Sequence, residues 1–244
     1  MHGVRYPVVE LRQYTLRPGQ RDVLIDLFDR EFVETQETAG MAIVGQFRDL
    51  DKPDRFVWIR GFASMPSRAQ ALASFYGGPV WKAHRAQANA TMIDTGNVLL
   101  LRPVTAGSGF PPPAAGRPPA GHTAPPPSRV LATICYRDHP FDEAFAGFFD
   151  RHVRPVLARA GAAPLACFQT EHAENTFPAL PVRTGENVFV WFAQFPSQAH
   201  LSDHVAGLEH PGRWQDQVLP ALLESLTSAP HQLRLAPTAR SLLR

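Results

Sequence analysis

Residues 8–47 read VVELRQYTLRPGQRDVLIDLFDREFVETQETAGMAIVGQF, and this stretch decides the fold. Residues 8–14 alternate in their side-chain character, which indicates a strand. Residues 20–38 place apolar side chains on one stripe of a helix, and Gly40 suits the left-handed cap at its end. Residues 41–47 then predict a second strand.

The next segment completes a βαββαβ unit. Residues 56–62 predict a third strand, Ser67 opens a helix as its N-cap, Gly77-Gly78-Pro79 interrupts that helix, and residues 97–102 predict the last strand. This order is that of the ferredoxin-like unit, in which two helices lie on one face of an antiparallel sheet. The other face of such a sheet is bare and has to be covered.

The second half of the chain repeats the pattern. LFDREF at residues 27–32 matches FFDRHV at residues 148–153, and FVW at residues 56–58 returns at residues 189–191. The offset grows from 121 to 133 residues, so the second half carries an insertion of about twelve residues. We therefore predict that the second copy covers the bare face of the first sheet. The two sheets would pack face to face into a barrel-like core, and the chain would form its own dimer, with further oligomerisation left open.

The second half should contain the same elements as the first. We expect strands near residues 130–136, 164–169, 187–194 and 232–235, and helices near residues 141–159 and 197–226. Pro155 and Pro220 lie inside these helices and should shorten, kink or interrupt them.

The segment between the halves, residues 105–128, has eight prolines and four glycines but only one large apolar residue, Phe110. It is expected to bury too little surface to fold and to form an extended linker. A proline-rich ligand for an adaptor domain is the alternative. We therefore expect two domains, residues 1–104 and 129–244.

Composition excludes several classes of protein. The net charge is +2, from 24 basic and 22 acidic residues, which argues against a nucleic-acid partner or a membrane surface. No stretch approaches the roughly 18 apolar residues of a membrane span. The start of the chain lacks the apolar run of a signal peptide, so we expect a cytoplasmic protein. Cys135 and Cys167 should be free and buried, on strands about 10 Å apart.

The first half resembles the domains of the NIPSNAP family. YPVVELRQYTLRPGQ (6–20), FVWIRGFASMPSRAQA (56–71), GGPVWKAHRAQAN (77–89) and LLLRP (99–103) carry the resemblance, which covers nearly all of residues 6–104. The second half resembles it more weakly. The resemblance implies a dimeric α/β barrel, whose superfamily includes cofactor-free monooxygenases, muconolactone isomerases and haem enzymes.

Candidate catalytic residues lie on the first strand. Glu10, Arg12 and Tyr14 alternate and therefore share one sheet face, with Val9 and Leu11 facing the helices. An acid, a guanidinium and a phenol on one face can bind an anion or relay a proton. The alternative is that Glu10 and Arg12 pair with charges across the barrel and only fix the strand register.

The second half has lost this triplet. At the offset of 121 residues the matching positions are Leu131, Thr133 and Cys135. A functional triplet would therefore give the molecule one such site rather than two.

Other residues could complete a pocket. His84 is a candidate base, and Trp58, Arg60, Tyr76 and Trp81 are candidate ligand-binding residues. The alternatives are aromatic core packing with a rim arginine and a partly exposed helix histidine.

Phe177, Leu180 and Val182 in the insertion near residues 170–186 suggest that this loop packs back as a lid or a covering flap. The alternative is a simple elaboration of the loop.

The insertion also contains Glu171, His172 and Glu174, but no second histidine stands at the spacing of a metal ligand. We therefore expect no metal and no cofactor.

Two classes of function remain. One is a pocket for a small apolar or anionic molecule, in a cofactor-independent oxygenase or isomerase that stabilises an enolate or phenolate. The other is a non-catalytic protein-interaction module, which a barrel filled by side chains would favour.

Overall fold

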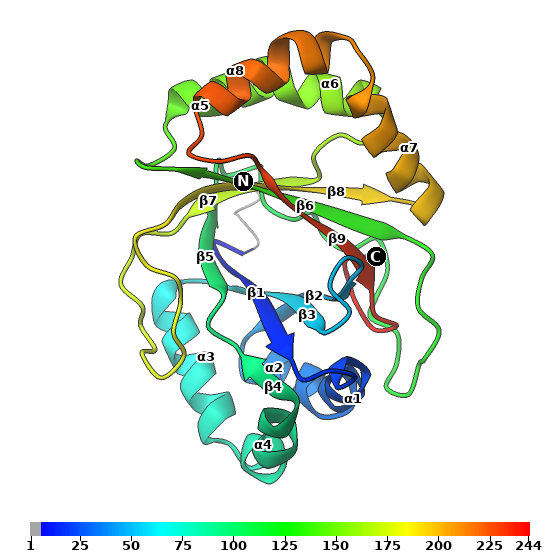
Figure 1. Ribbon diagram of the computed structural model, residues 1–244. Helices are drawn as coiled ribbons and strands as arrows, with labels where there is room; N and C mark the ends of the chain where they lie inside the picture. The colour runs from blue at the N-terminus through cyan, green and yellow to red at the C-terminus, as the bar shows by residue number, and fades with distance from the viewer. Residues whose placement is uncertain (1–5) are drawn as a thin grey trace.

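A computed structural model describes residues 6–244 and shows a closed antiparallel barrel with helices on its outside (Figure 1). The expectation about a signal peptide concerned the first residues, of which residues 1–5 lie outside the described part. The strands are β1 (Val8–Leu16), β2 (Ala42–Asp49), β3 (Arg55–Phe62), β4 (Met92–Asp94), β5 (Val98–Pro103), β6 (Arg129–Arg137), β7 (Ala166–Thr170), β8 (Asn187–Phe195) and β9 (His231–Pro237).

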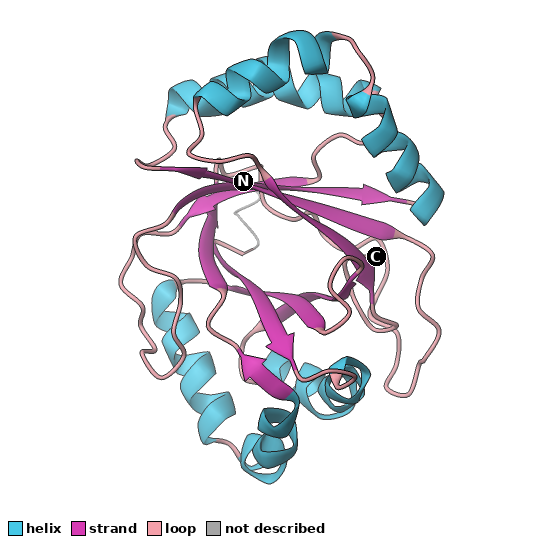
Figure 2. Cartoon of the chain, in the orientation of Figure 1, coloured by secondary structure: helices cyan, strands magenta, loops and turns pink. Residues whose placement is uncertain are grey.

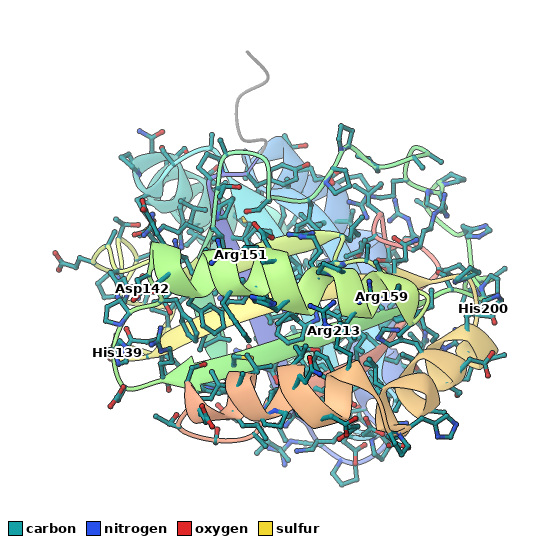
Figure 3. The ribbon with its side chains drawn as sticks, turned by 90° about the horizontal axis from the view of Figure 1, so that it is seen from above. His139, Asp142, Arg151, Arg159, His200 and Arg213 are labelled. Atoms are coloured by element: carbon teal, nitrogen blue, oxygen red, sulfur yellow. The ribbon has the colours of Figure 1, made fainter. Side chains whose placement is uncertain are left out.

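The helices form two layers, one beside each half of the barrel (Figure 2). They are α1 (Arg21–Leu27), α2 (Val33–Thr38), α3 (Met65–Gly77), α4 (Pro79–Thr91), α5 (Glu143–Phe148), α6 (Arg154–Arg159), α7 (Gln198–Glu209) and α8 (Leu219–Glu224), with π-helical segments at Phe28–Phe32, Phe149–Val153 and Trp214–Val218. In the view from above (Figure 3), the second layer covers the barrel, and the labelled Arg151, Arg159 and Arg213 lie on its exposed surface.

The barrel closes through the sheet edges. Its strand order is β3-β2-β9-β6-β8-β7-β5-β1, and β1 pairs with β3 to complete the ring. The first half contributes the run β2-β3-β1-β5 and the second the run β7-β8-β6-β9, joined by β2–β9 and β5–β7 pairs. The expected barrel-like core is present, but the halves join edge to edge rather than as two stacked sheets. Closure pairs edge strands that would otherwise expose unsatisfied backbone groups. The division into two ferredoxin-like domains stays a prediction.

The interior of the barrel is filled by apolar side chains, among them Val9, Leu11, Phe47, Ile59 and Phe168. The prediction that Val9 and Leu11 face the helices was therefore wrong, because alternation defines two faces but not which one lies inside a closed barrel. The face that carries the charged triplet is the one that meets the helices.

The segment 105–128 is not a free linker. Phe110 packs on Phe168 and Phe192 inside the barrel cluster, with both ring centroids at 4.9 Å. Arg117 donates to the backbone oxygens of Ile43 and Arg240, each at 2.6 Å. The segment was expected to bury too little surface to fold, and it contains no helix or strand, but one aromatic ring and one guanidinium tie it to the barrel.

The helices differ from expectation at a few points. The helix predicted at Ser67 begins at Met65, because Ser64 is the N-cap and Ser67 completes a capping box with it. The break at Gly77-Gly78-Pro79 is confirmed between α3 and α4. Pro155 and Pro220 each stand in the first turn of a short helix that follows a π-helical segment, so the change from π to α geometry falls at the prolines.

The prediction for the two cysteines is confirmed. Cys135 and Cys167 are free and buried, and β8 lies between their strands. Burial raises the pKa of both thiols, that of Cys167 to about 11. Among residues 6–244, no helix is long and apolar enough to cross a membrane.

Candidate functional site

One buried carboxylate binds three arginines beneath the first helix layer. Oε2 of Glu10 accepts hydrogen bonds from Nη1 of Arg12 at 2.6 Å and from Nε of Arg60 at 2.7 Å. Its Oε1 accepts from Nε of Arg68, on α3, at 2.6 Å. All four side chains have a relative exposure of 0%. The cluster of Glu10, Arg12, Arg60 and Arg68 is called the arginine cluster below.

The arginine cluster carries a net charge of +2, from three guanidinium groups and one carboxylate. Nη2 of Arg12, of Arg60 and of Arg68 have no hydrogen-bond partner within residues 6–244. Leaving buried charges without full pairing costs free energy. Because the net charge of +2 lies in a region of low dielectric, the cluster creates a strongly positive potential.

The protonation states follow from this arrangement. Burial alone would raise the pKa of Glu10, but the charges of Arg60, Arg12 and Arg68 outweigh it and hold that pKa well below its usual range. Glu10 is therefore a fixed anion and a poor proton acceptor. Burial raises the pKa of Tyr14 although Arg12 acts in the opposite direction, so Tyr14 is a neutral phenol.

A pocket of about 230 Å³ lies between the helices and the sheet on this side of the barrel. Aromatic rings dominate its lining: Tyr14, Phe28, Phe32, Trp58, Phe75, Tyr76 and Trp81. A cavity of about 150 Å³ already accepts benzene, so this pocket has room for a substituted aromatic ring.

Tyr14 and Trp58 connect the pocket to the arginine cluster. Nε of Arg12 donates to the Tyr14 hydroxyl oxygen at 2.9 Å, which leaves the phenolic proton free to point elsewhere. The Trp58 ring has the guanidinium carbons of Arg60 and Arg12 at 4.9 and 5.5 Å from its centroid. Its Nε1 has no hydrogen-bond partner in the described part of the chain. Two side chains that line an aromatic pocket thus carry an N–H or O–H donor next to positive charge.

The insertion of the second half covers this pocket. Leu180 lines it, and the ring of Phe177 stacks on Tyr76 with centroids 6.0 Å apart. Asn175 and Thr176 accept hydrogen bonds from Nη1 of Arg68 at 2.9 and 3.3 Å. The expected covering flap is therefore present, and it lies over the first half of the chain.

Four of the predicted residues, Tyr14, Trp58, Tyr76 and Trp81, line the pocket. Glu10, Arg12 and Arg60 lie together behind its floor. Glu10 pairs with charges, as the alternative expected, but its partners are on β1, β3 and α3 rather than across the barrel.

His84 is not among the residues that line the pocket. Its Nε2 lies 3.6 Å from a carboxylate oxygen of Glu31, and its side chain is 30% exposed.

Sequence reasoning missed two contributors. Arg68 stands on the apolar stripe that Ala71, Leu72 and Phe75 define, and a charge on such a stripe is the signal that could have found it. Gln36 lines the pocket and accepts from Nη1 of Arg60 at 3.3 Å, but nothing in its sequence context indicates this. Within residues 6–244, no group of three His, Cys, Asp or Glu side chains could hold a metal ion.

An antiparallel α/β barrel with an aromatic pocket under its helices defines the class of the protein. Solved structures of the same fold cover nearly the whole chain. A putative monooxygenase from Fusobacterium nucleatum is 8% identical, with a TM-score of 0.58, and the match covers 98% of this chain and 94% of that one. A putative monooxygenase from Lactobacillus acidophilus is 12% identical, with a TM-score of 0.51, over 96% of this chain and 94% of that one. An anthrone oxidase-like protein is 10% identical, with a TM-score of 0.52, over 97% and 93%.

The NIPSNAP family model matches residues 9–106, which confirms the resemblance predicted for the first half of the chain. The match ends before the second half. No curated protein matches the sequence.

Proposed function

We propose that the pocket binds a small aromatic molecule with an ionisable oxygen, a phenol or an enolisable ketone, and stabilises it as its anion. The observation that carries this proposal is the hydrogen bond from Arg12 to Tyr14 at the floor of an aromatic pocket. A phenol that accepts from a guanidinium is a stronger donor toward a third group.

The position of the charges supports an anionic ligand. The ligand oxygen would accept from the Tyr14 hydroxyl or from Nε1 of Trp58, and the net charge of +2 would lie directly behind these donors. Donors and charges that are fixed before the reaction stabilise a developing oxyanion without reorganising. This is the arrangement that an enolate or a phenolate requires.

The pocket has little capacity to remove a proton by itself. Among its described lining residues there is no carboxylate and no imidazole. Glu10 is held ionised behind the floor and His84 lies outside. The substrates that fit are therefore acidic enough to ionise once the anion is stabilised, with the proton passing to solvent.

An enolate or phenolate is electron-rich and reacts with dioxygen without a cofactor, or takes up a proton at another carbon and isomerises. The names of the neighbours of similar fold, two putative monooxygenases and an anthrone oxidase-like protein, favour dioxygen as the oxidant. This rests on analogy of fold. The filled barrel interior does not argue for an interaction module, because the pocket lies outside the barrel.

Binding of 4-nitrophenol tests the proposal, because this phenol ionises near neutral pH and absorbs visible light only as its anion. We expect the bound phenol to ionise about one pH unit lower than the free one, a change of about 1.4 kcal/mol. Arg12→Ala should weaken binding of the anion by about tenfold or more. Tyr14→Phe, which keeps the ring, should weaken it about three- to tenfold, the effect of one hydrogen bond.

Arg151→Ala, on the exposed helix surface of the second half, is the matched control and should bind as the unmodified protein does. Variants at Arg12 and Tyr14 that lose thermal stability but keep their affinity for the anion would overturn the proposal. Uptake of dioxygen with anthrone as substrate then separates an oxygenase from an isomerase.

A further inference from the structure

A second pocket, of about 190 Å³, lies under the helix layer of the second half. Its lining comes from β6, β8, β9, α7 and the helical segment that follows α7. Leu131, Thr133, Trp191, His204, Glu209 and Trp214 are among the residues that line it. It occupies the same place between helices and sheet in the second half that the aromatic pocket occupies in the first.

The strand registers make this correspondence specific. Arg12 is paired with Trp58 across β1 and β3, and Thr133 is paired with Trp191 across β6 and β8. Thr133 thus stands opposite a tryptophan at the position where the first half has an arginine. Glu10 pairs with Arg60 in the first half, whereas Leu131 pairs with Ala193 in the second. The second pocket keeps the tryptophan and lacks the positive charges.

Two residues that line the second pocket, Thr133 and His204, carry buried polar groups. The Thr133 side chain is 1% exposed, and its hydroxyl has no hydrogen-bond partner within residues 6–244. A buried hydroxyl without a partner is costly, and a ligand that satisfies it would gain from doing so. This hydroxyl can both donate and accept.

His204 supplies an acceptor. Its Nδ1 lies 2.9 Å from the backbone oxygen of Ala160, and because a carbonyl oxygen only accepts, Nδ1 carries the proton. Nε2 of the neutral ring then bears a lone pair that can accept a hydrogen bond. His204 is 3% exposed and lines the pocket. Burial lowers its pKa, which agrees with a neutral ring.

The charge near the second pocket has the opposite sign. With His204 neutral, Glu209 is the one charged side chain among the described residues that line this pocket. An anionic ligand would meet a carboxylate and no guanidinium there. A neutral ligand avoids this repulsion and can use both buried polar groups.

We propose that the second pocket is a separate binding site for a neutral aromatic molecule that carries a hydroxyl or N–H group. The donor of the ligand meets Nε2 of His204, the Thr133 hydroxyl takes a second polar atom, and Trp191 and Trp214 contact the ring. This site does not depend on the function proposed for the first pocket.

The four tryptophans allow each pocket to be followed alone. Trp58 and Trp81 line the first pocket, and Trp191 and Trp214 line the second. The variant W58F/W81F therefore reports on the second pocket by fluorescence, and W191F/W214F reports on the first.

The ligands are 4-nitrobenzyl alcohol, which is neutral, and 4-nitrobenzoate, its anionic counterpart of similar shape. Both quench tryptophan. Free tryptophan amide with the same ligand concentrations corrects for absorption and collisional quenching.

In W58F/W81F we expect saturable quenching by the alcohol, with an affinity at least about tenfold higher than that for the benzoate. Adding Thr133→Val, which nearly keeps the shape, should weaken binding of the alcohol about three- to tenfold. Adding Glu209→Gln should narrow the preference for the alcohol, because it removes the carboxylate that repels the benzoate.

The proposal would be overturned if quenching of Trp191 and Trp214 by the alcohol did not saturate. It would also be overturned if the affinity for the alcohol were the same with and without the Thr133→Val substitution. A preference for the benzoate in W58F/W81F would also overturn it. Unfolding of the Thr133 variant leaves the charge preference and its response to Glu209→Gln as the deciding measurements.

Discussion

The two helix-facing surfaces of the barrel share their backbone pattern and differ in chemistry. The first half buries Glu10, Arg12, Arg60 and Arg68 in contact with one another. The second half has Leu131, Thr133, Ala193 and Leu201 at the matching positions, and three of these, Leu131, Ala193 and Leu201, belong to one apolar cluster. Ser64 and Ser197 cap α3 and α7 and place Arg68 and Leu201 at the same point of their helices.

This difference teaches that the fold does not need the arginine cluster. A buried ion network is weak evidence for stability, because apolar residues of similar size can replace it at little cost. The second half shows such a replacement on the same framework. The unpaired Nη2 atoms and the net charge of the first half fit the binding role that we propose for the cluster.

The largest expected effect comes from breaking the network at its centre. Glu10→Leu would leave three buried guanidiniums without their common carboxylate and should lower the free energy of unfolding by about 3–5 kcal/mol. Urea unfolding measures it. Asp51→Asn, which breaks the exposed pair with Arg234, is the control and should cost less than about 1 kcal/mol. A loss in Glu10→Leu as small as in the control would show that the network contributes little.

The same carboxylate gives a pH dependence. The pKa of Glu10 is lowered on folding, so its contribution to stability is complete above its ordinary value of 4.5 and is lost as the pH falls below it.

The next effect separates folding from binding. Replacing the whole cluster by its counterparts, Glu10→Leu with Arg12→Thr, Arg60→Ala and Arg68→Leu, should restore most of the stability lost in Glu10→Leu, to within about 2 kcal/mol of the unmodified protein. It should still reduce binding of 4-nitrophenolate by more than about tenfold. Parallel loss of stability and binding would mean that the cluster is structural.

A smaller effect distinguishes the two π-helical segments. Asp29 and Asp150 occupy the same place in them, but burial raises the pKa of Asp29 to about 6. The folded state thus favours its protonated form, so this group stabilises the protein below pH 3.8, and the contribution is lost as the pH rises through about 6.

We expect Asp29→Asn to remove about 1–2 kcal/mol of this pH dependence, after allowing for partial exposure. Asp150→Asn, on the exposed side of its helix, is the matched control variant. Thermal unfolding between pH 4 and 8 provides the comparison, and identical profiles for the two variants would contradict the assignment.

The smallest effect tests the division of the chain into two domains, which we still propose. Residues 120–124 are all exposed, so a protease site placed there should be cut. The halves should not separate, because the β2–β9 and β5–β7 strand pairs hold them together. Gel filtration after cleavage should show one species of unchanged size. Separation of the halves would contradict a barrel closed by these pairs.

The sequence predicted the helices and strands better than it predicted which face of each strand lies inside the barrel. Alternation placed Glu10, Arg12 and Tyr14 together, because the period of a strand is local. It assigned Val9 and Leu11 to the wrong side, because both faces of a closed barrel under helices are buried and both can be apolar.

The candidate site could not be predicted in full, because it is built from contacts between residues that are far apart in the sequence. Arg68 reaches Glu10 over 58 residues, and Asn175 reaches Arg68 over 107. Strand periodicity carries no information on such distances. The aromatic residues Tyr76 and Trp81 could be assigned to a pocket since they flank the break between α3 and α4, but the partners of each charge needed the structure.

The flap at residues 171–186 has a consequence for the way this protein can change over time. Both of its ends are attached to the second half, at β7 and β8, while Phe177 and Leu180 lie against the pocket of the first. The first half supplies the rest of the lining, and the second half supplies its cover. Insertions and substitutions in the flap would alter which ligand the proposed pocket accepts and would leave every barrel strand unchanged. Evolution can therefore change ligand choice without changing the barrel.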